Sequence, residues 1–516
     1  MAQTIKAIPA ADDLVKITVI NPEYFVVYNT TSGPAIMLKL PGIELEDIRG
    51  RSVNINNIKR VTIVRKENSI PSTITDGVTI VTLKQDNAND LSVRPYIDTT
   101  AQDGKLYYYR LFISGVMNTQ DNMRNSVSIT VDLTSSQHIY GFKIRKSESD
   151  PATRVEYTDD NVAFTPMSVT TTSTNYGSWA DSFIIKNTFR PVALTYNGVV
   201  DYELNHDDQT KKLDGTASDI SNADYQGNMM VEVKKLYMYC YEDSEYEYCK
   251  IANYPVDSNY TSYAFVNDAG ESVNQIYLPM FKGSNINNRL RSIADQAPQS
   301  ATSGATEISL AQANGEGWYI RSWSEWVLIQ NLLILLGKST DTQSVFGSGH
   351  QSGGSSAESL LTTGTLKNKG MFYGDPATNS NVAVKVFWLE NWYGDRWDRT
   401  AGCIINSTTN TICVKPSRPF NGNSTNGYID TELYPVGTSG GYISTMKMTK
   451  YGLIPKSISG SSSTYYTDGC WFATGERYAL TGGACSIGLR VGALYVALDY
   501  SFAYSNWNLG ASPSFS

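Results

Sequence analysis

Apolar residues in the first part of the chain recur at every second position, in short runs that polar turns separate. This alternation, rich in β-branched residues, is typical of half-buried β-strands. We expect strands at residues 14–20, 24–28, 61–64, 78–83, 107–113 and 127–131. Residues 1–140 are therefore predicted to form one or two small all-β modules.

A helical pattern follows much later in the chain. Ser322 and Glu325 match a capping box, in which a serine hydroxyl and a glutamate carboxylate satisfy backbone N–H groups at the start of a helix. Apolar residues then continue at helical spacing, namely Trp326, Ile329, Leu332, Leu333 and Leu336. Gly337 is a suitable residue for the C-terminal end of this helix.

The distribution of tryptophan divides the chain into parts of different composition. All nine tryptophans lie beyond residue 178. Before them, residues 150–173 carry Pro151 and a Thr- and Ser-rich tract, which favour turns and loops. We therefore expect a connector or a small β module over residues 141–178 and a separate domain over residues 179–516.

The segment from Gly482 to Gly510 follows neither a helical nor a strand period. Its glycines stand at positions 482, 483, 488, 492 and 510, with large and chemically mixed side chains between them. A missing Cβ permits turns and close approaches that other residues cannot make. The segment is predicted to be a fixed backbone frame that displays side chains. The alternative is an ordinary Gly- and Tyr-rich end of a β-rich protein, made of strands and turns.

This segment resembles the variable region of the proteins that diversity-generating retroelements diversify. The resemblance rests on Gly482-Gly483, Gly488, Gly492-Ala493 and residues 505–510, SNWNLG. Most of these proteins are phage receptor-binding proteins, in which a C-type-lectin-like fold, shared with formylglycine-generating enzymes, stays fixed while selected codons are rewritten. The resemblance implies a mostly β chain with an α+β C-terminal domain. N-terminal β modules would precede a C-type-lectin-like domain whose variable region lies near residues 482–510.

Two further motifs resemble landmarks of formylglycine-generating-enzyme-like domains. Residues 322–326, SWSEW, resemble the acidic-Trp start of a family helix without its usual Pro, and residues 390–397, ENWYGDRW, resemble the turn beside it. Cys485 stands where the family commonly has Trp. We expect Glu325 and Glu390 to cap and bridge loops. Because large aromatic residues dominate core energetics, we expect these tryptophans in the core: Trp323, Trp326, Trp392, Trp397, Trp471 and Trp507.

The resemblance implies a receptor-binding face made of residues between the glycines. Its expected members are Ser486, Ile487, Leu489, Arg490, Tyr495, Ala497, Asp499, Tyr500, Phe502 and Tyr504. Tyrosine suits recognition because it offers a large amphipathic contact area and loses little rotamer entropy on binding. The chain holds 34 Tyr against 15 Phe. The expected partner is a host cell-surface receptor, either a protein or a polysaccharide.

Composition and charge exclude several classes of function. Charged residues make up 18% of the chain, against roughly 25% in a typical soluble domain. The net charge of −8 and the lack of a basic stripe argue against nucleic-acid binding. The longest apolar run, residues 332–336, is far shorter than the roughly 18 residues that a membrane-spanning helix needs. Residues 1–16 lack the pattern of a secretory signal, as expected for a virion protein assembled in the host cytoplasm.

The six cysteines are spaced too irregularly for a paired zinc clip. Cys240 with Cys249, or Cys403 with Cys413, could staple a hairpin, but a protein made in a reducing cytosol usually keeps free thiols. We expect no cofactor. The acidic residues 201–224 leave a structural calcium ion open, although their spacing favours a solvated loop. The Gly- and Ser-rich residues 347–356 are predicted to form a flexible loop.

Catalytic signatures are weak. The three histidines have no neighbouring Ser or Cys motif that would complete a triad. A glycan depolymerase would need two carboxylates beside a glycosidic bond. The acidic candidates are Asp395 with Asp398, or Glu476 with Asp499. We therefore expect a protein that is not an enzyme.

Together these features predict a phage receptor-binding protein at a tail or fibre tip. Residues 1–140 would attach it to other tail proteins or build an oligomer, which is commonly a homotrimer in fibre proteins. The C-terminal domain would bind the host receptor and so determine host range. The alternatives are a tail-associated glycan depolymerase and a variable adhesin displayed on a cell surface. The second would be favoured by a lipobox cysteine near the start of the sequence, and none is present there.

Overall fold

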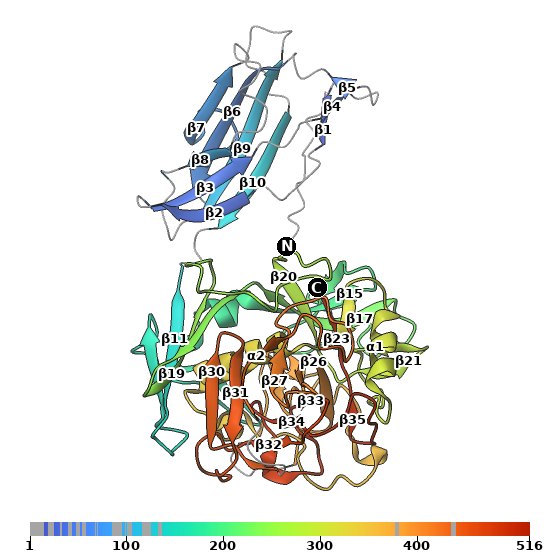
Figure 1. Cartoon of the computed structure of the whole chain (residues 1–516). Helices are drawn as coiled ribbons and strands as arrows, with labels where there is room; N and C mark the ends of the chain where they lie inside the picture. Colours follow the sequence, from blue (N-terminus) through green and yellow to red (C-terminus); the bar gives the residue numbers. More distant parts are fainter. Residues whose placement is uncertain are drawn as a thin grey trace. The chain divides into compact units, whose positions relative to one another are not determined.

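The chain divides into two compact units, Met1–Gln137 and His138–Ser516 (Figure 1). The computed structural model describes residues 137–376, 381–434 and 440–516, together with strands β1 to β10 and residues 69, 71–77 and 100 of the first unit. In the first unit, side chains are described at residues 62–67, 69, 71–82, 100, 108 and 112. About 34% of the structure is strand and 11% is helix, which confirms the prediction of a mostly β fold.

The first unit is built from three antiparallel sheets. One has the order β1-β4-β5, with β1 Val15–Thr18, β4 Glu44–Asp47 and β5 Ser52–Val53. The second has the order β2-β3-β8, with β2 Phe25–Thr30, β3 Gly33–Lys39 and β8 Pro95–Asp98. The third has the order β10-β9-β6-β7, with β10 Asn125–Asp132, β9 Leu106–Gly115, β6 Ile58–Glu67 and β7 Val78–Lys84. All six predicted strands are present, and β3, β4, β5 and β8 were missed.

Residues 141–178 belong to the second unit, so the prediction of a connector or separate module was wrong. Strands β11 Ile139–Arg145 and β12 Val155–Asp159 form a sheet of order β12-β11-β19-β18 with β18 Tyr237–Glu242 and β19 Tyr246–Ala252. Tyr140, Phe142 and Trp179 are buried in the main core of this unit. The cause is long-range pairing, because β11 is hydrogen-bonded to a strand about a hundred residues later.

A six-stranded antiparallel sheet holds the end of the chain. Its order is β16-β15-β17-β20-β36-β23. The strands are β15 Phe189–Thr195, β16 Val200–Glu203, β17 Gly227–Lys234, β20 Gln275–Pro279, β23 Trp318–Ile320 and β36 Pro513–Phe515. The last strand, β36, lies between β20 and β23. The residues that follow the predicted variable region are therefore fixed inside a sheet.

The largest sheet carries two parts of the predicted variable region. Its order is β28-β27-β26-β33-β34-β32-β29, and β35 pairs with β26. The strands are β26 Trp397–Ile405, β27 Ile412–Val414, β28 Ile429–Asp430, β29 Gly441–Tyr442, β32 Gly469–Phe472, β33 Arg477–Thr481, β34 Val496–Leu498 and β35 Leu509–Gly510. The β32–β34 and β26–β35 pairs are parallel, and the other pairs are antiparallel.

Short strand pairs and helices complete the second unit. The pairs are β13 Ser168–Val169 with β14 Thr174–Asn175, β21 Ser284–Ile286 with β22 Arg289–Arg291, β24 Lys385–Val386 with β25 Leu389–Glu390, and β30 Thr445–Thr449 with β31 Gly452–Ser457. The helices are α1 Gly304–Gln312, α2 Trp323–Gly337 and α3 Thr342–Phe346. Single helical turns lie at Gly177–Trp179, Ile184–Thr188, Ala357–Ser359 and Gly488–Arg490. Within the described residues, no helix is long and apolar enough to cross a membrane.

Helix α2 confirms the predicted capping box. The Ser322 hydroxyl accepts a hydrogen bond from the Glu325 N–H at 3.3 Å, and the Glu325 carboxylate accepts one from the Ser322 N–H at 2.8 Å. All fifteen helix residues are buried, so α2 is a central element and not a surface helix. Gly337 is the last helical residue, and Lys338 takes the left-handed cap at φ 51°.

A buried ion network joins distant segments of the second unit around Asp398. Arg396 Nη2 lies 2.6 Å from Asp398 Oδ1, and Lys282 Nζ lies 3.1 Å from Oδ2. Arg321 Nη2 lies 3.3 Å from the same Oδ2, and the Ser512 hydroxyl also donates to this carboxylate. Burial alone would raise the pKa of Asp398, but Lys282, Arg321 and Arg396 hold it well below its ordinary range. The Asp398 carboxylate therefore pairs with three buried cations at once.

We predict that Asp398→Asn lowers the free energy of unfolding of the second unit by about 3–5 kcal/mol, because it leaves buried cations without a counter-ion. Urea unfolding followed by tryptophan fluorescence measures this unit, since all nine tryptophans lie in it. Asp181→Asn is the matched control. Its ion pair with Lys186 is exposed, so its loss should cost well under 1 kcal/mol. Equal effects of the two substitutions would contradict a structural role for the network.

Candidate functional site

Two glycines fix the start of the predicted variable region. Gly482 and Gly483 both take left-handed backbone conformations, with φ of 84° and 81°. A Cβ atom on Gly483 would lie 2.7 Å from Val491 Cγ1, and one on Gly482 would lie 3.1 Å from the Trp392 carbonyl oxygen. Any larger residue would therefore be strained by both its conformation and its neighbours. This part of the segment is a rigid backbone frame.

Eight of the ten residues expected on the receptor-binding face reach the surface. Ser486 is exposed, and seven others are half-buried, namely Ile487, Leu489, Arg490, Asp499, Tyr500, Phe502 and Tyr504. Tyr495 and Ala497 are each only 1% exposed, so their assignment to the face was wrong. Ala497 lies in β34, between β33 and β32, where the sheet covers it. The Tyr495 ring packs against Trp471, with centroids 5.7 Å apart, and so supports the face from beneath.

Five partly exposed side chains form what we call the terminal face: Trp471, Ile487, Arg490, Tyr500 and Tyr504. Four of them, all except Arg490, pack on a buried cluster that includes Trp397 and Tyr495. The Tyr500 and Tyr504 rings are stacked, with centroids 4.2 Å apart and planes inclined by 23°. Large side chains that are already held in place lose little entropy on binding a partner. The terminal face is thus a preorganised aromatic surface.

Arg490 is held over aromatic rings at one side of this face. Its guanidinium lies 5.3 Å from the Tyr442 ring centroid and 5.4 Å from that of Trp471. Cation–π contacts of this kind orient the charge at small cost. Trp471 was expected in the core, but it is only half-buried because it forms this contact surface, and Trp507 is half-buried as well. The other four tryptophans expected in the core are buried.

Phe502 and Ser486 contact different parts of the second unit. The Phe502 ring lies 4.9 Å from that of Tyr478 and packs on a separate core cluster. The Ser486 hydroxyl accepts a hydrogen bond of 3.0 Å from the Asn508 side chain, which ties two ends of the segment together. The half-buried Leu489 contributes a backbone carbonyl that accepts a bond from Gln343. The structure therefore gathers some of the expected face residues into one surface and places Phe502 elsewhere.

Asp499 is the acidic group within the predicted variable region. Burial raises its pKa to about 6, and the charge of Arg477 opposes that shift. Its Oδ1 atom is buried and accepts no hydrogen bond from the described residues. Glu476, the other member of this candidate carboxylate pair, accepts a bond from Asn423. Within the described residues, no hydrogen-bond partner joins the two carboxylates.

The loop predicted to be flexible is instead partly buried around His350. Residues 346–351 are all buried, and His350 Nδ1 lies 2.7 Å from Asp395 Oδ1. Cys485 completes a group of three potential metal ligands whose atoms lie within 4.8 Å of one another, and the acidic residues 201–224 provide no such group. In tetrahedral zinc sites two ligand atoms lie about 3.4 Å apart. The shorter His350–Asp395 contact is a hydrogen bond that anchors the loop.

Cys485 does not have the properties of a catalytic nucleophile. No sequence motif links Cys485 to His350, but the fold brings the two residues together with Asp395. Burial and the charge of Asp395 raise the pKa of this thiol to about 12, whereas nucleophilic cysteines have lowered values. All six cysteines are buried free thiols, and Cys240 Sγ lies 3.5 Å from Cys249 Sγ.

The carboxylates expected to serve a depolymerase have structural partners. Asp398 is the counter-ion of the buried network, and Asp395 accepts hydrogen bonds from His350 and the Leu361 N–H. Glu390 bridges loops as predicted, because it accepts bonds of 2.8 Å from the Gly364 and Leu366 N–H groups.

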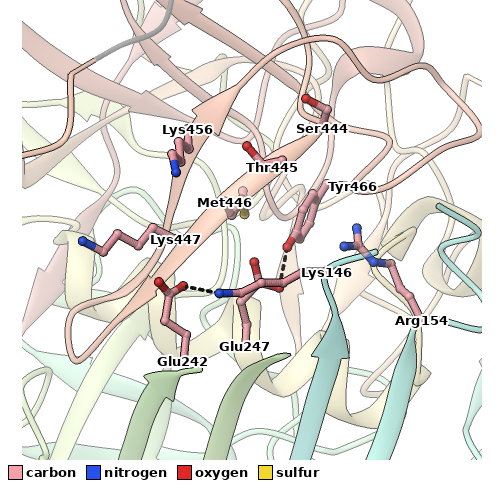
Figure 2. A pocket seen from close by; sticks show the side chains of 10 residues that line it. All are labelled: Lys146, Arg154, Glu242, Glu247, Ser444, Thr445, Met446, Lys447, Lys456 and Tyr466. Atoms are coloured by element: carbon pink, nitrogen blue, oxygen red, sulfur yellow. Dashed lines mark hydrogen bonds and ion pairs between the residues drawn. The ribbon is translucent and has the colours of Figure 1, made fainter. Parts of the chain in front are cut away.

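A cavity of about 160 Å³ lies between the β30–β31 hairpin and the β11–β19 region. Figure 2 shows its lining, which is Lys146, Arg154, Glu242, Glu247, Ser444, Thr445, Met446, Lys447, Lys456 and Tyr466. We call it the Arg154 cavity. Burial raises the pKa of Glu247 to about 7, although the Tyr466 hydroxyl donates to it at 2.8 Å. No sequence pattern predicts this cavity, because its residues come from segments up to 320 positions apart.

No protein-family model and no curated protein matches the chain. The resemblance to retroelement-diversified proteins therefore stays a prediction. Function must be inferred from the terminal face, the Arg154 cavity and the buried frame that carries them.

We predict that Asp499→Asn stabilises the protein at pH 8 by about 1 kcal/mol, a value reduced for the solvent that reaches this carboxylate. The folded-state pKa lies above the ordinary value, so ionisation of Asp499 opposes folding. This penalty is absent below about pH 4 and complete above about pH 6. The melting temperatures of the variant and the parent should therefore converge as the pH falls from 8 to 4. A difference in melting temperature that stays constant between pH 8 and pH 4 would contradict the raised pKa of Asp499.

Proposed function

We propose that this chain is a phage receptor-binding protein of a tail or fibre tip, which binds a host cell-surface receptor through its terminal face. The observation that carries the proposal is the division of the segment 482–510 into two kinds of residue. Glycines and buried residues hold the backbone, while side chains between them, such as Arg490, Tyr500 and Tyr504, are partly exposed. A diversified binding surface needs this separation, because its contact residues must change without unfolding the frame.

The side chains of the terminal face favour receptor binding over catalysis. Tyr, Trp and Arg are the residues most enriched at the energetic centres of protein interfaces. The terminal face offers all three, and its rings are already stacked. A hydrolase would instead need an aligned pair of carboxylates, and Asp398 and Asp395 are bound to structural partners. This contrast is why we place the glycan depolymerase second.

The remaining parts of the proposal concern assembly. The β-rich first unit would attach the chain to other tail proteins or build a homotrimer in the virion. Several terminal faces on one tip would raise the apparent affinity through effective concentration, even where each single contact is weak. A variable adhesin displayed on a cell would use the same face, so the two hypotheses differ in location and share one binding mechanism.

A bulky charge placed in the turn before Tyr504 tests the face without removing a packed ring. Ala503 is exposed, so Ala503→Arg should leave the melting temperature within about 2 °C of the parent. We predict at least a tenfold loss of binding to cells of the propagating host, measured with fluorescently labelled full-length protein. Ala269→Arg is the matched control, since Ala269 is also an exposed turn residue, and it should bind like the parent. Unchanged binding by Ala503→Arg would refute the terminal face.

Sequencing tests diversification directly. Across a propagated phage population, we predict codon changes at Ser486, Arg490, Asp499, Tyr500 and Tyr504. The codons of the frame glycines and of the buried residues at positions 495 and 497 should not vary, because changes there would disturb the sheet. Deep sequencing of the 3′ end of the gene measures this pattern. Equal variation at buried and exposed codons would contradict a frame that displays diversified residues, and no variation at all would indicate a fixed adhesin.

A further inference from the structure

The Arg154 cavity contains a buried cation, two of whose nitrogens have no acceptor among the described residues. Arg154 is 1% exposed, and its guanidinium lies 4.4 Å from the centroid of the Tyr466 ring. Its Nη2 donates to the Arg145 carbonyl at 3.2 Å, but Nε and Nη1 have no hydrogen-bond partner in the described part of the chain. A buried donor without an acceptor carries a full desolvation penalty. Such a group calls for an acceptor from outside the chain.

Lysines add to the positive charge of this cavity. Lys146 is paired with Glu242 at 3.3 Å and also donates to the Asp243 carbonyl. Lys447 and Lys456 lie on the β30–β31 hairpin, where Lys447 is half-buried and Lys456 is exposed. In Figure 2 these two lysines and Arg154 lie on opposite sides of the cavity. Glu242 and Glu247 are drawn between the lysines and Arg154 in Figure 2, so the lysines would act on a ligand at Arg154 through their electrostatic field.

Acidic groups cancel only part of this charge, and the charge of Arg154 itself favours the ionised form of Glu247. Glu242 is engaged by Lys146 and by the Met448 N–H at 3.0 Å. Glu247 is buried, and its pKa of about 7 leaves it partly protonated at neutral pH. The lining therefore holds four cationic side chains against at most two carboxylates, so the cavity carries at least two net positive charges.

We propose that the Arg154 cavity is a binding site for a compact oxyanion, such as the carboxylate of an acidic sugar. A volume of about 160 Å³ suits one charged group, since pockets for drug-sized ligands measure roughly 300–1,000 Å³. A carboxylate or phosphate supplies the acceptors that Arg154 lacks, and guanidinium groups match both. The choice of an acidic sugar as the carrier rests on the proposed receptor-binding function. The oxyanion site itself does not depend on it.

Isothermal titration of the full-length chain tests this site with four probes: galacturonate, galactose, acetate and inorganic phosphate. We expect saturable binding of galacturonate and none of galactose, which has the same ring without the carboxylate. Phosphate binding tighter than that of galacturonate would assign the site to phosphate groups and still support an oxyanion. Failure of every oxyanion to bind, or equal binding of galactose, would overturn the proposal.

Variants then tie the binding to this cavity. The double substitution Lys447→Gln with Lys456→Gln should weaken oxyanion binding about tenfold. Lys450→Gln is the matched control, because Lys450 lies in the same hairpin outside the cavity lining, and it should bind like the parent. Glu247→Gln removes a competing negative charge and keeps an acceptor for Tyr466, so it should tighten binding several-fold. A gain of affinity cannot come from misfolding.

Unchanged affinity in both the lysine pair and Glu247→Gln would place the binding elsewhere and overturn the assignment. The result is separable from that of the receptor-binding proposal, since Ala503→Arg changes the terminal face and leaves the cavity lining intact. Loss of host-cell binding in Ala503→Arg without oxyanion binding by the parent would support the face alone.

Discussion

The buried carboxylate of Asp398 is the constraint on which the second unit depends. It neutralises cations that come from three separate places: Lys282 after β20, Arg321 before α2 and Arg396 before β26. Buried ion networks do not by themselves increase stability, because desolvation offsets the attraction. Such a network favours one arrangement of the segments that it joins, because leaving any partner unpaired costs free energy. The central helix, the largest sheet and the chain end at Ser512 are thereby fixed relative to one another.

This arrangement explains how a segment with little regular structure can be rigid. Residues 482–510 leave β33, supply β34 and β35 to the largest sheet, and continue into β36 of the other sheet. The segment is therefore held in sheets at several points, and Asp468 accepts a further bond of 2.6 Å from the Leu494 N–H. Loops between such anchors can carry different side chains at low energetic cost, because exposed substitutions shift stability little. The same topology that makes the frame rigid would therefore tolerate different side chains on the terminal face.

Local signals in the sequence predicted local structure well. Strand alternation located six strands of the first unit, and the Ser322–Glu325 spacing located the start of α2, because both depend on neighbouring residues only. Features that depend on strand pairing between distant segments could not be predicted from the sequence. Tyr495 was predicted to lie on the receptor-binding face. It is buried instead, because β34, the strand that follows it, pairs in parallel with β32. The same holds for residues 141–178, whose first strand β11 pairs with β19, and for the loop around His350, which Asp395 anchors.

The terminal face and the Arg154 cavity are formed by different parts of the chain. None of the residues that line the Arg154 cavity lies between positions 482 and 510. Codon rewriting of the variable region would therefore leave the cavity unchanged, while the terminal face would change in shape and charge. As proposed, the cavity would bind one charged group through fixed donors, whereas the terminal face would bind a broad surface through aromatic contacts. If both proposals hold, the cavity would keep a weak constant contact with acidic groups while the face varies, so that a newly diversified face would still meet the host surface at a high local concentration.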